Sequence, residues 1–155
     1  MNKPVKVAII ISNYYSGYRG MLAAAEDEAS KIGAEISIVS EVPGCFDMPL
    51  PVKKLLQRND VDAVVALGVI LPVPHKTISK DSSTEEITVW DETIANGTID
   101  RLDALSLEFD KPVVKELIGP GFPVNAVKDK VELYARAGVS TAVQLVKEIE
   151  RISII

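Results

Sequence analysis

The sequence predicts an α/β protein, a three-layer sandwich around a four-stranded parallel sheet of flavodoxin-like topology. Runs of β-branched residues alternate along the chain with segments of helical composition, and strands separated by helices form parallel sheets with right-handed crossovers. The runs Val5–Ser12 and Ala63–Leu71 are almost entirely apolar, which is typical of strands covered on both faces. The length of 155 residues favours one domain over residues 1–155.

Each expected element follows from its residue pattern and from the glycines and prolines that bound it. Gly33 suits the end of the first helix. Val52, Leu55 and Leu56 form one stripe of the second helix, and Tyr134 is placed with the core valines of the last one. We expect strands at Val5–Ser12, Glu35–Glu41, Ala63–Leu71 and Pro112–Ile118, helices at Met21–Ile32, Leu50–Arg58, about Thr88 to Glu108 and Asn125–Arg151, and an exposed loop at Pro72–Ser83.

Composition and charge exclude several classes of function. The 17 basic residues against 22 acidic ones argue against nucleic acid and against a polybasic membrane contact, because phosphate binding needs clustered cations. No apolar run reaches the length of a membrane span. One histidine and one cysteine match no metal-ligand spacing, and no glycine-rich nucleotide motif is present, so we expect neither a metal nor a cofactor. A cytoplasmic protein is the expectation.

The fold class predicts where a ligand binds. Parallel sheets of this kind bind ligands beyond the carboxyl ends of their strands. Four segments follow those ends and are expected to form one rim: Asn13–Gly17, Pro43–Asp47, Val69–Ser83 and Gly119–Pro123.

Several rim residues suit a flat heterocycle. Tyr14 has a ring that can stack, and Asn13 can hydrogen-bond to a ring edge; the alternative is that the tyrosines pack under a loop or in a subunit contact. Gly44 permits a close approach of the backbone, and Cys45 is interpreted as a small packing residue. His75, the sole histidine, is either an acid/base group or a solvated loop residue.

These segments, in this order, resemble the lumazine synthase family, particularly its archaeal type. The strongest match is Val42–Leu56, VPGCFDMPLPVKKLL, followed by NDVDAVVALGVI. Further matches are Leu105–Val113, LSLEFDKPV, and the turn Gly119-Pro120-Gly121.

The resemblance implies an activity and partners. Lumazine synthases join 5-amino-6-(D-ribitylamino)uracil to 3,4-dihydroxy-2-butanone 4-phosphate in riboflavin biosynthesis, without a metal or cofactor. Their sites lie between subunits of a pentamer, so the resemblance implies a homo-oligomer, a pentamer or a multiple of pentamers. Two other hypotheses stay open: a catalytically impaired homologue that binds lumazine or flavin, and an archaeal-type riboflavin synthase.

The resemblance also implies site residues. Gly44, Cys45, Phe46 and Asp47 match the loop that holds the ribityl chain and the pyrimidine. The backbone of Val69, Ile70 and Leu71 matches the segment that contacts both substrates. Asn13 and Tyr14 occupy the place of the family's aromatic–Asn pair in inverted order, and Lys130 falls where the family carries a phosphate-binding Arg.

One segment departs from the family. The family follows its third strand with G-x-T-x-H-[DY], which supplies a phosphate-binding turn and a catalytic His. Here the strand is followed by PVPHKTISKDSSTEEITVWDE. Two interpretations compete: His75 acts as the catalytic acid/base beside a rebuilt phosphate turn, or that group is lost and Trp90 fills or stacks in the pocket.

Overall fold

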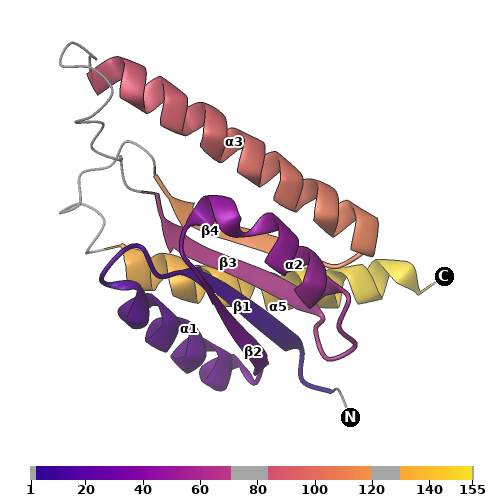
Figure 1. The fold of residues 1–155 in the computed structure, drawn as a ribbon. Helices are drawn as coiled ribbons and strands as arrows, with labels where there is room; N and C mark the ends of the chain where they lie inside the picture. The colour runs from indigo at the N-terminus through magenta and orange to yellow at the C-terminus, as the bar shows by residue number, and fades with distance from the viewer. Residues whose placement is uncertain (1–2, 71–83, 120–129, 155) are drawn as a thin grey trace.

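The computed structural model describes residues 3–70, 84–119 and 130–154, with the side chains of 84–92 left out. Within these residues the chain forms a four-stranded parallel sheet in the order β2-β1-β3-β4, which is the flavodoxin-like arrangement (Figure 1). The strands are β1 (Lys6–Ser12), β2 (Glu35–Val42), β3 (Ala63–Val69) and β4 (Val113–Ile118). The predicted fold class is therefore confirmed.

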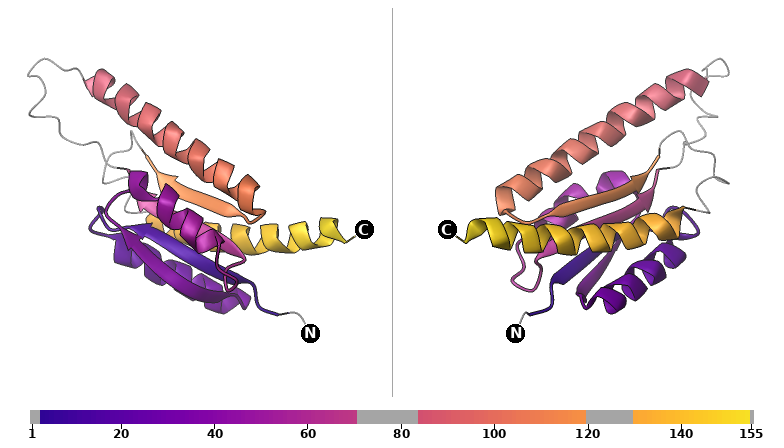
Figure 2. Two further views of the ribbon diagram at one scale, coloured as in Figure 1. Left: turned by 45° about the vertical axis from the view of Figure 1, so that its right-hand side comes forward. Right: turned by 180° about the vertical axis from the view of Figure 1, so that it is seen from behind.

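Helices cover both faces of the sheet (Figures 1 and 2). On one face lie α1 (Tyr18–Ile32) and α5 (Val131–Ser153), and on the other lie α2 (Pro49–Leu56) and α3 (Thr84–Phe109). A short 3-10 helix, η1 (Cys45–Asp47), precedes α2. Every residue of β3 is buried, as expected for a strand with helices on both sides.

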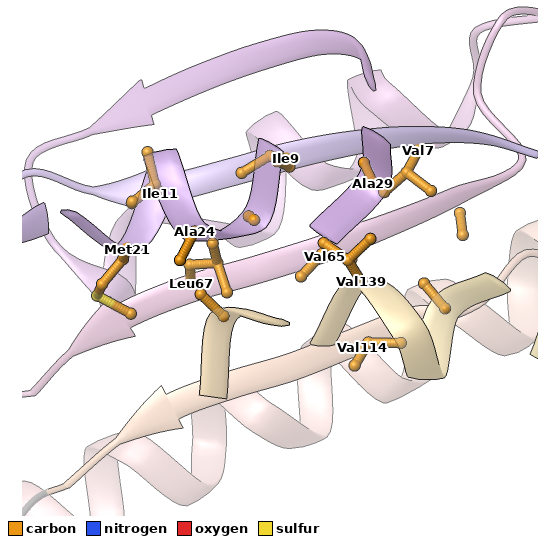
Figure 3. Close-up of a cluster of buried hydrophobic side chains, with 14 of the residues drawn as sticks. Val7, Ile9, Ile11, Met21, Ala24, Ala29, Val65, Leu67, Val114 and Val139 are labelled. Carbon is orange, nitrogen blue, oxygen red and sulfur yellow. The ribbon is translucent and has the colours of Figure 1, made fainter. Parts of the chain in front are cut away.

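Two apolar clusters hold the three layers together. The cluster beneath α1 and α5 combines strand residues such as Ile9 and Val65 with small helix residues such as Ala24 and Ala29 (Figure 3). The cluster on the other face joins Ile10 and Val64 to α2 and to Leu102 of α3. The alternating directions of side chains along β1 send its even and odd residues to opposite clusters.

The expected element order is confirmed, while several boundaries were wrong. Helix α1 begins at Tyr18, three residues before the expected Met21. The prediction was wrong because Gly17 and Gly20 are typical turn residues, whereas Gly20 lies within the first helical turn. Tyr134, placed with the core valines, is 37% exposed. The exposed loop expected at Pro72–Ser83 lies outside the described residues.

Candidate functional site

A pocket of about 270 Å³ opens at the carboxyl ends of β1, β2 and β3. Its wall is built from three of the four expected rim segments, together with the last residue of β1. Seven of the twelve candidate site residues line it. The full lining is Ser12, Tyr14, Pro43, Gly44, Cys45, Phe46, Asp47, Val69 and Ile70.

The loop after β2 buries two of its side chains and exposes the two that lie between them. The Asp47 N–H donates to the Gly44 carbonyl oxygen at 3.1 Å and closes the single turn of η1. Within this turn Cys45 is 5% exposed and Met48 is fully buried, so both anchor the loop to the core. Phe46 is 39% exposed and lines the pocket. The loop thus holds an aromatic ring and a carboxylate at the pocket wall.

The two tyrosines after β1 have different environments. Tyr15 is buried and its ring lies over Gly17, where an added Cβ would come within 2.6 Å of the Cε1 atom. Tyr14 is 56% exposed and lines the pocket. Packing under a loop therefore describes Tyr15, whereas Tyr14 has the freedom to stack on a ligand. Asn13 is exposed and is not a lining residue; its N–H donates to the Val42 carbonyl oxygen at 2.9 Å.

The opposite wall depends on a close contact between the ends of β3 and β4. The Ile70 N–H donates to the Ile118 carbonyl oxygen at 2.7 Å. Gly119 follows with a φ of +105°, and a Cβ on it would lie 2.4 Å from the Ile70 carbonyl oxygen. Only glycine combines that backbone conformation with this approach. The position of the backbone beside the pocket therefore depends on β4 as well as on β3.

The chemistry of the lining favours a neutral ligand. Among the nine lining residues Asp47 is the one charged side chain, and none is Lys, Arg or His. Burial raises the pKa of the Cys45 thiol to about 11, although hydrogen bonds with Ser12 and with its own backbone oppose the rise. The thiol is thus protonated at neutral pH, which excludes it as a nucleophile there. Two rings, a carboxylate and apolar walls suit a flat heterocycle that carries hydroxyl groups.

Five candidate residues are not among those that line the pocket. Asn13 and Lys130 are exposed; Lys130 precedes α5, which begins at the edge of the sheet where the strands end (Figure 1). Trp90 belongs to α3, but its side chain is outside the described part. Leu71 and His75 also lie outside the described residues, so their roles stay predictions.

Sequence reasoning missed two lining residues, Ser12 and Pro43. Ser12 is 1% exposed, and its position as the polar last residue of an otherwise apolar strand was the available signal, because buried polar groups need partners. Pro43 opens one of the expected rim segments but was not placed among the candidate site residues.

Neither a group of metal-ligating side chains nor a membrane-spanning helix is present in the described part of the chain. Among the residues described, no three His, Cys, Asp or Glu side chains are grouped so that they could hold a metal ion. The helices within that same part also lack the combination of length and apolar character that crossing a bilayer requires.

Comparisons with known proteins show which family the sequence matches. Residues 4–151 match the family model described as 6,7-dimethyl-8-ribityllumazine synthase. The chain is 34% identical over 149 residues to a protein of that name from Methanococcus maripaludis, covering 96% of this chain and 98% of the relative. It is also 34% identical over 151 residues to one from Saccharolobus islandicus, at 97% and 90% coverage. Among solved structures, a diflavin flavoprotein from Nostoc sp. matches with a TM-score of 0.46 and 11% identity over 98% of this chain and 99% of that one, too distant to bear on function.

Proposed function

The chain belongs to the 6,7-dimethyl-8-ribityllumazine synthase family, and on that premise we propose that it is a lumazine synthase. It condenses 5-amino-6-(D-ribitylamino)uracil with 3,4-dihydroxy-2-butanone 4-phosphate and releases inorganic phosphate and water. The observation that carries the proposal is the pocket at the carboxyl ends of β1, β2 and β3, because its lining suits a neutral ring with a polyol chain.

Each lining group has a proposed role toward the pyrimidine substrate. Tyr14 and Phe46, the two exposed rings of the pocket, offer flat faces to the heterocycle. The Asp47 carboxylate accepts hydrogen bonds from ribityl hydroxyl groups, and Gly44 lets the chain approach the backbone. The backbone of Val69 and Ile70 contacts the ring from the side of β3.

Holding two substrates face to face supplies much of the catalysis. The amine of the pyrimidine attacks the ketone carbonyl and forms an imine with loss of water. Loss of a proton from C3 then expels phosphate from C4, and the resulting enol becomes a second carbonyl at C3. The nitrogen that bears the ribityl chain closes the ring on this carbonyl with loss of a second water. Positioning alone turns a bimolecular step into an effectively unimolecular one. The phosphate needs a cation, which the nine lining residues do not supply; we assign it to Lys130. His75 is proposed as the general acid/base, a role typically worth roughly 10²–10⁴-fold in rate.

A second candidate function is binding without turnover. It is favoured by the absence of His, Lys and Arg from the described pocket lining. In that case the protein would bind lumazine or flavin as a ligand, and Trp90 would fill the place of the family's histidine.

One experiment separates these functions. The purified protein is mixed with both substrates, and product is followed by lumazine fluorescence. We expect lumazine above the uncatalysed rate. Tight binding of added lumazine or flavin, seen as quenching of its fluorescence without turnover, would instead support the binding function. Conversion of added lumazine to riboflavin would support a riboflavin synthase. No product above background would remove the synthase proposal.

Variants then test the proposed roles. Tyr14→Ala and Phe46→Ala should each raise KM for the pyrimidine by about tenfold, since an aromatic contact is worth about 1 kcal/mol beyond its buried area. Leu107→Ala is the matched control, because Leu107 is 81% exposed on α3 and does not line the pocket. His75→Ala should lower kcat by more than tenfold, and an unchanged kcat would reject the catalytic role of His75.

We further propose that the protein works as a homo-oligomer. Exposed apolar side chains near the end of α5 support this: Leu145, Ile149, Ile152 and Ile154 are between 37% and 83% exposed. Surfaces of this kind are typical of contacts between subunits. Light scattering should give a mass several times that of the 16.8 kDa chain, and a monomer throughout would contradict the proposal.

A further inference from the structure

Ser12 is a buried polar residue at the junction of the two loops that carry the aromatic rings of the pocket. It ends β1 and is 1% exposed. Its hydroxyl group donates to the Pro43 carbonyl oxygen at 3.4 Å and accepts from the Tyr14 N–H, also at 3.4 Å. One side chain therefore joins the start of the Pro43–Asp47 loop to the residue that presents the Tyr14 ring.

The third strand of the pocket reaches the same junction. Gly68 lies in β3, and a Cβ on it would come within 2.5 Å of the Cys45 Sγ atom and 3.1 Å of the Ser12 Cβ atom. The Ser12 side chain also opposes the rise that burial causes in the pKa of the Cys45 thiol, as expected for two side chains that lie next to each other. The missing side chain of Gly68 thus leaves the space in which Ser12 and Cys45 meet, directly beneath the pocket.

We propose that Ser12 is a positioning residue for the heterocyclic substrate, and this inference rests on the proposed function. Its hydroxyl group fixes the separation between the Tyr14 backbone and the Pro43–Asp47 loop, and so sets the spacing of the rings of Tyr14 and Phe46. Because Ser12 is almost fully buried, it acts through these loops. Both hydrogen bonds are long and individually weak, so the effect on ligand affinity is moderate.

The test compares Ser12→Ala with Ser37→Ala. Ser37 is a matched control, because its hydroxyl group also joins β2 to β1, donating to the Val7 carbonyl oxygen at 3.5 Å, yet it does not line the pocket. Affinity for 6,7-dimethyl-8-ribityllumazine is measured by fluorescence titration, and Tm by thermal unfolding. Ser12→Ala should raise Kd for lumazine and KM for the pyrimidine by about fivefold, while KM for the butanone phosphate stays within twofold. Ser37→Ala should lower Tm to a similar extent and leave both binding constants unchanged.

A double-mutant cycle checks that Ser12 acts through Tyr14. In the Tyr14→Ala background, removing the Ser12 hydroxyl group should weaken lumazine binding by no more than about twofold, since the ring that it positions is gone. Gly68→Ala crowds the same junction from β3 and should weaken lumazine binding too, which provides the measurement if Ser12→Ala does not fold.

Three outcomes would overturn the inference. The first is wild-type lumazine affinity in Ser12→Ala or, should that variant not fold, in Gly68→Ala. The second is an equal loss of lumazine affinity in Ser12→Ala and Ser37→Ala. The third is a double variant in which the losses of affinity from Ser12→Ala and Tyr14→Ala are fully additive. These outcomes leave the wild-type activity intact, whereas failure of the proposed function would appear as neither turnover nor lumazine binding by the wild-type protein.

Discussion

The two faces of the sheet are packed in different ways. On the α1/α5 face, small residues let the two helices lie close to the sheet and to each other: Ala24, Ala25, Ala29, Ala135 and Ala142 are all at most 4% exposed. Arg136 of α5 also pairs with α1, its Nη1 atom lying 2.6 Å from Asp27 Oδ2 and 3.7 Å from Glu28 Oε2.

On the α2/α3 face, two of the residues that complete the core also line the pocket, whereas the cluster on the α1/α5 face contributes Val69, at the end of β3, as its one lining residue. Cys45 and Ile70 belong to the cluster on the α2/α3 face, so the packing that stabilises this face also forms the wall of the site. The comparison suggests a division of roles, in which changes on the α1/α5 face away from Val69 affect stability alone and changes on the pocket side affect binding. The variants below test that division.

The largest effect is expected from Gly119→Ala. The new Cβ would lie 2.4 Å from the Ile70 carbonyl oxygen, and the φ of +105° is a conformation that alanine rarely adopts. The Ile70 carbonyl oxygen belongs to the backbone and cannot rotate away as a side chain would. Either the β3–β4 contact or the pocket wall must therefore move. We expect kcat/KM to fall by more than about thirtyfold, alongside a stability loss of about 3 kcal/mol.

The control for this variant is Gly33→Ala. Gly33 also has a positive φ, +73°, at the end of α1, but a Cβ there meets nothing within 4 Å. It should lose about 1 kcal/mol of stability and keep wild-type kcat/KM. Equal kcat/KM in the two variants would contradict the importance of the Ile70 contact for the site.

Gly138→Val should reduce stability and leave the site intact. Gly138 lies on α5, and even a single Cβ there would come within 2.9 Å of Glu116 Cγ and 3.0 Å of Val65 Cγ1. Valine adds two more carbons to this crowded position, so the free energy of unfolding should fall by about 3 kcal/mol. Urea unfolding measures it, and lumazine affinity at low temperature should equal that of wild type. A loss of affinity without a loss of stability would break the division between the two faces.

The two faces should also respond to opposite extremes of pH. On the pocket side, burial raises the pKa of the Cys45 thiol from 9.0 to about 11. The unfolded chain therefore loses this proton first, so the associated stability is present below pH 9 and is lost as the pH rises toward 11. The stability difference between wild type and Cys45→Ala should shrink by about 2 kcal/mol over that range. A difference that stays constant would argue against a buried, protonated thiol.

On the α1/α5 face the dependence has the opposite sign. A hydrogen bond from Arg136, supported by Lys31, lowers the pKa of the Asp27 carboxyl group. The stability from this contact is present above the ordinary pKa of an aspartate and is lost as the pH falls through the lowered value. Arg136→Gln should therefore remove part of the acid sensitivity seen in urea midpoints, and high salt should have the same effect, because the groups are exposed.

Much of the fold was readable from the sequence because its strands are distinctive. The apolar run that became β3 has no polar interruption, and β-branched runs of this kind are typical of a strand with both faces covered. The partner of Arg136 could not be predicted from the sequence: helical spacing points to Glu132, one turn away, whereas Asp27 lies 109 positions earlier in the chain. Sequence spacing describes neighbours on one helix, but only the packing of α1 on α5 brings these two groups together.

The site was predicted in the same uneven way. The Pro43–Asp47 loop and Tyr14 were selected because both follow strands that end at one edge of the sheet, and the structure places them around one pocket. Ser12 was not selected, since its role depends on two loops that are distant in sequence and meet only in the folded chain. Gly68, inside a buried strand, was a readable signal of close approach, but the pattern alone does not say which atoms approach.

The smallest expected effect comes from Gly97→Ala and sharpens the contrast with Gly138. Both glycines lie inside long helices, but a Cβ on Gly97 of α3 meets nothing within 4 Å. Alanine there reduces the conformational entropy of the unfolded chain without any clash, so stability should rise by about 0.5–1 kcal/mol. Urea unfolding measures the change in the free energy of unfolding in Gly97→Ala and in Gly138→Ala. Because the gain in helix propensity is the same in both variants, the difference between the two changes reports the local environment of each glycine. A destabilised Gly97→Ala variant would mean that this turn of α3 is packed against something in the working protein, and the outer surface of α3 would then have to be counted as an interface.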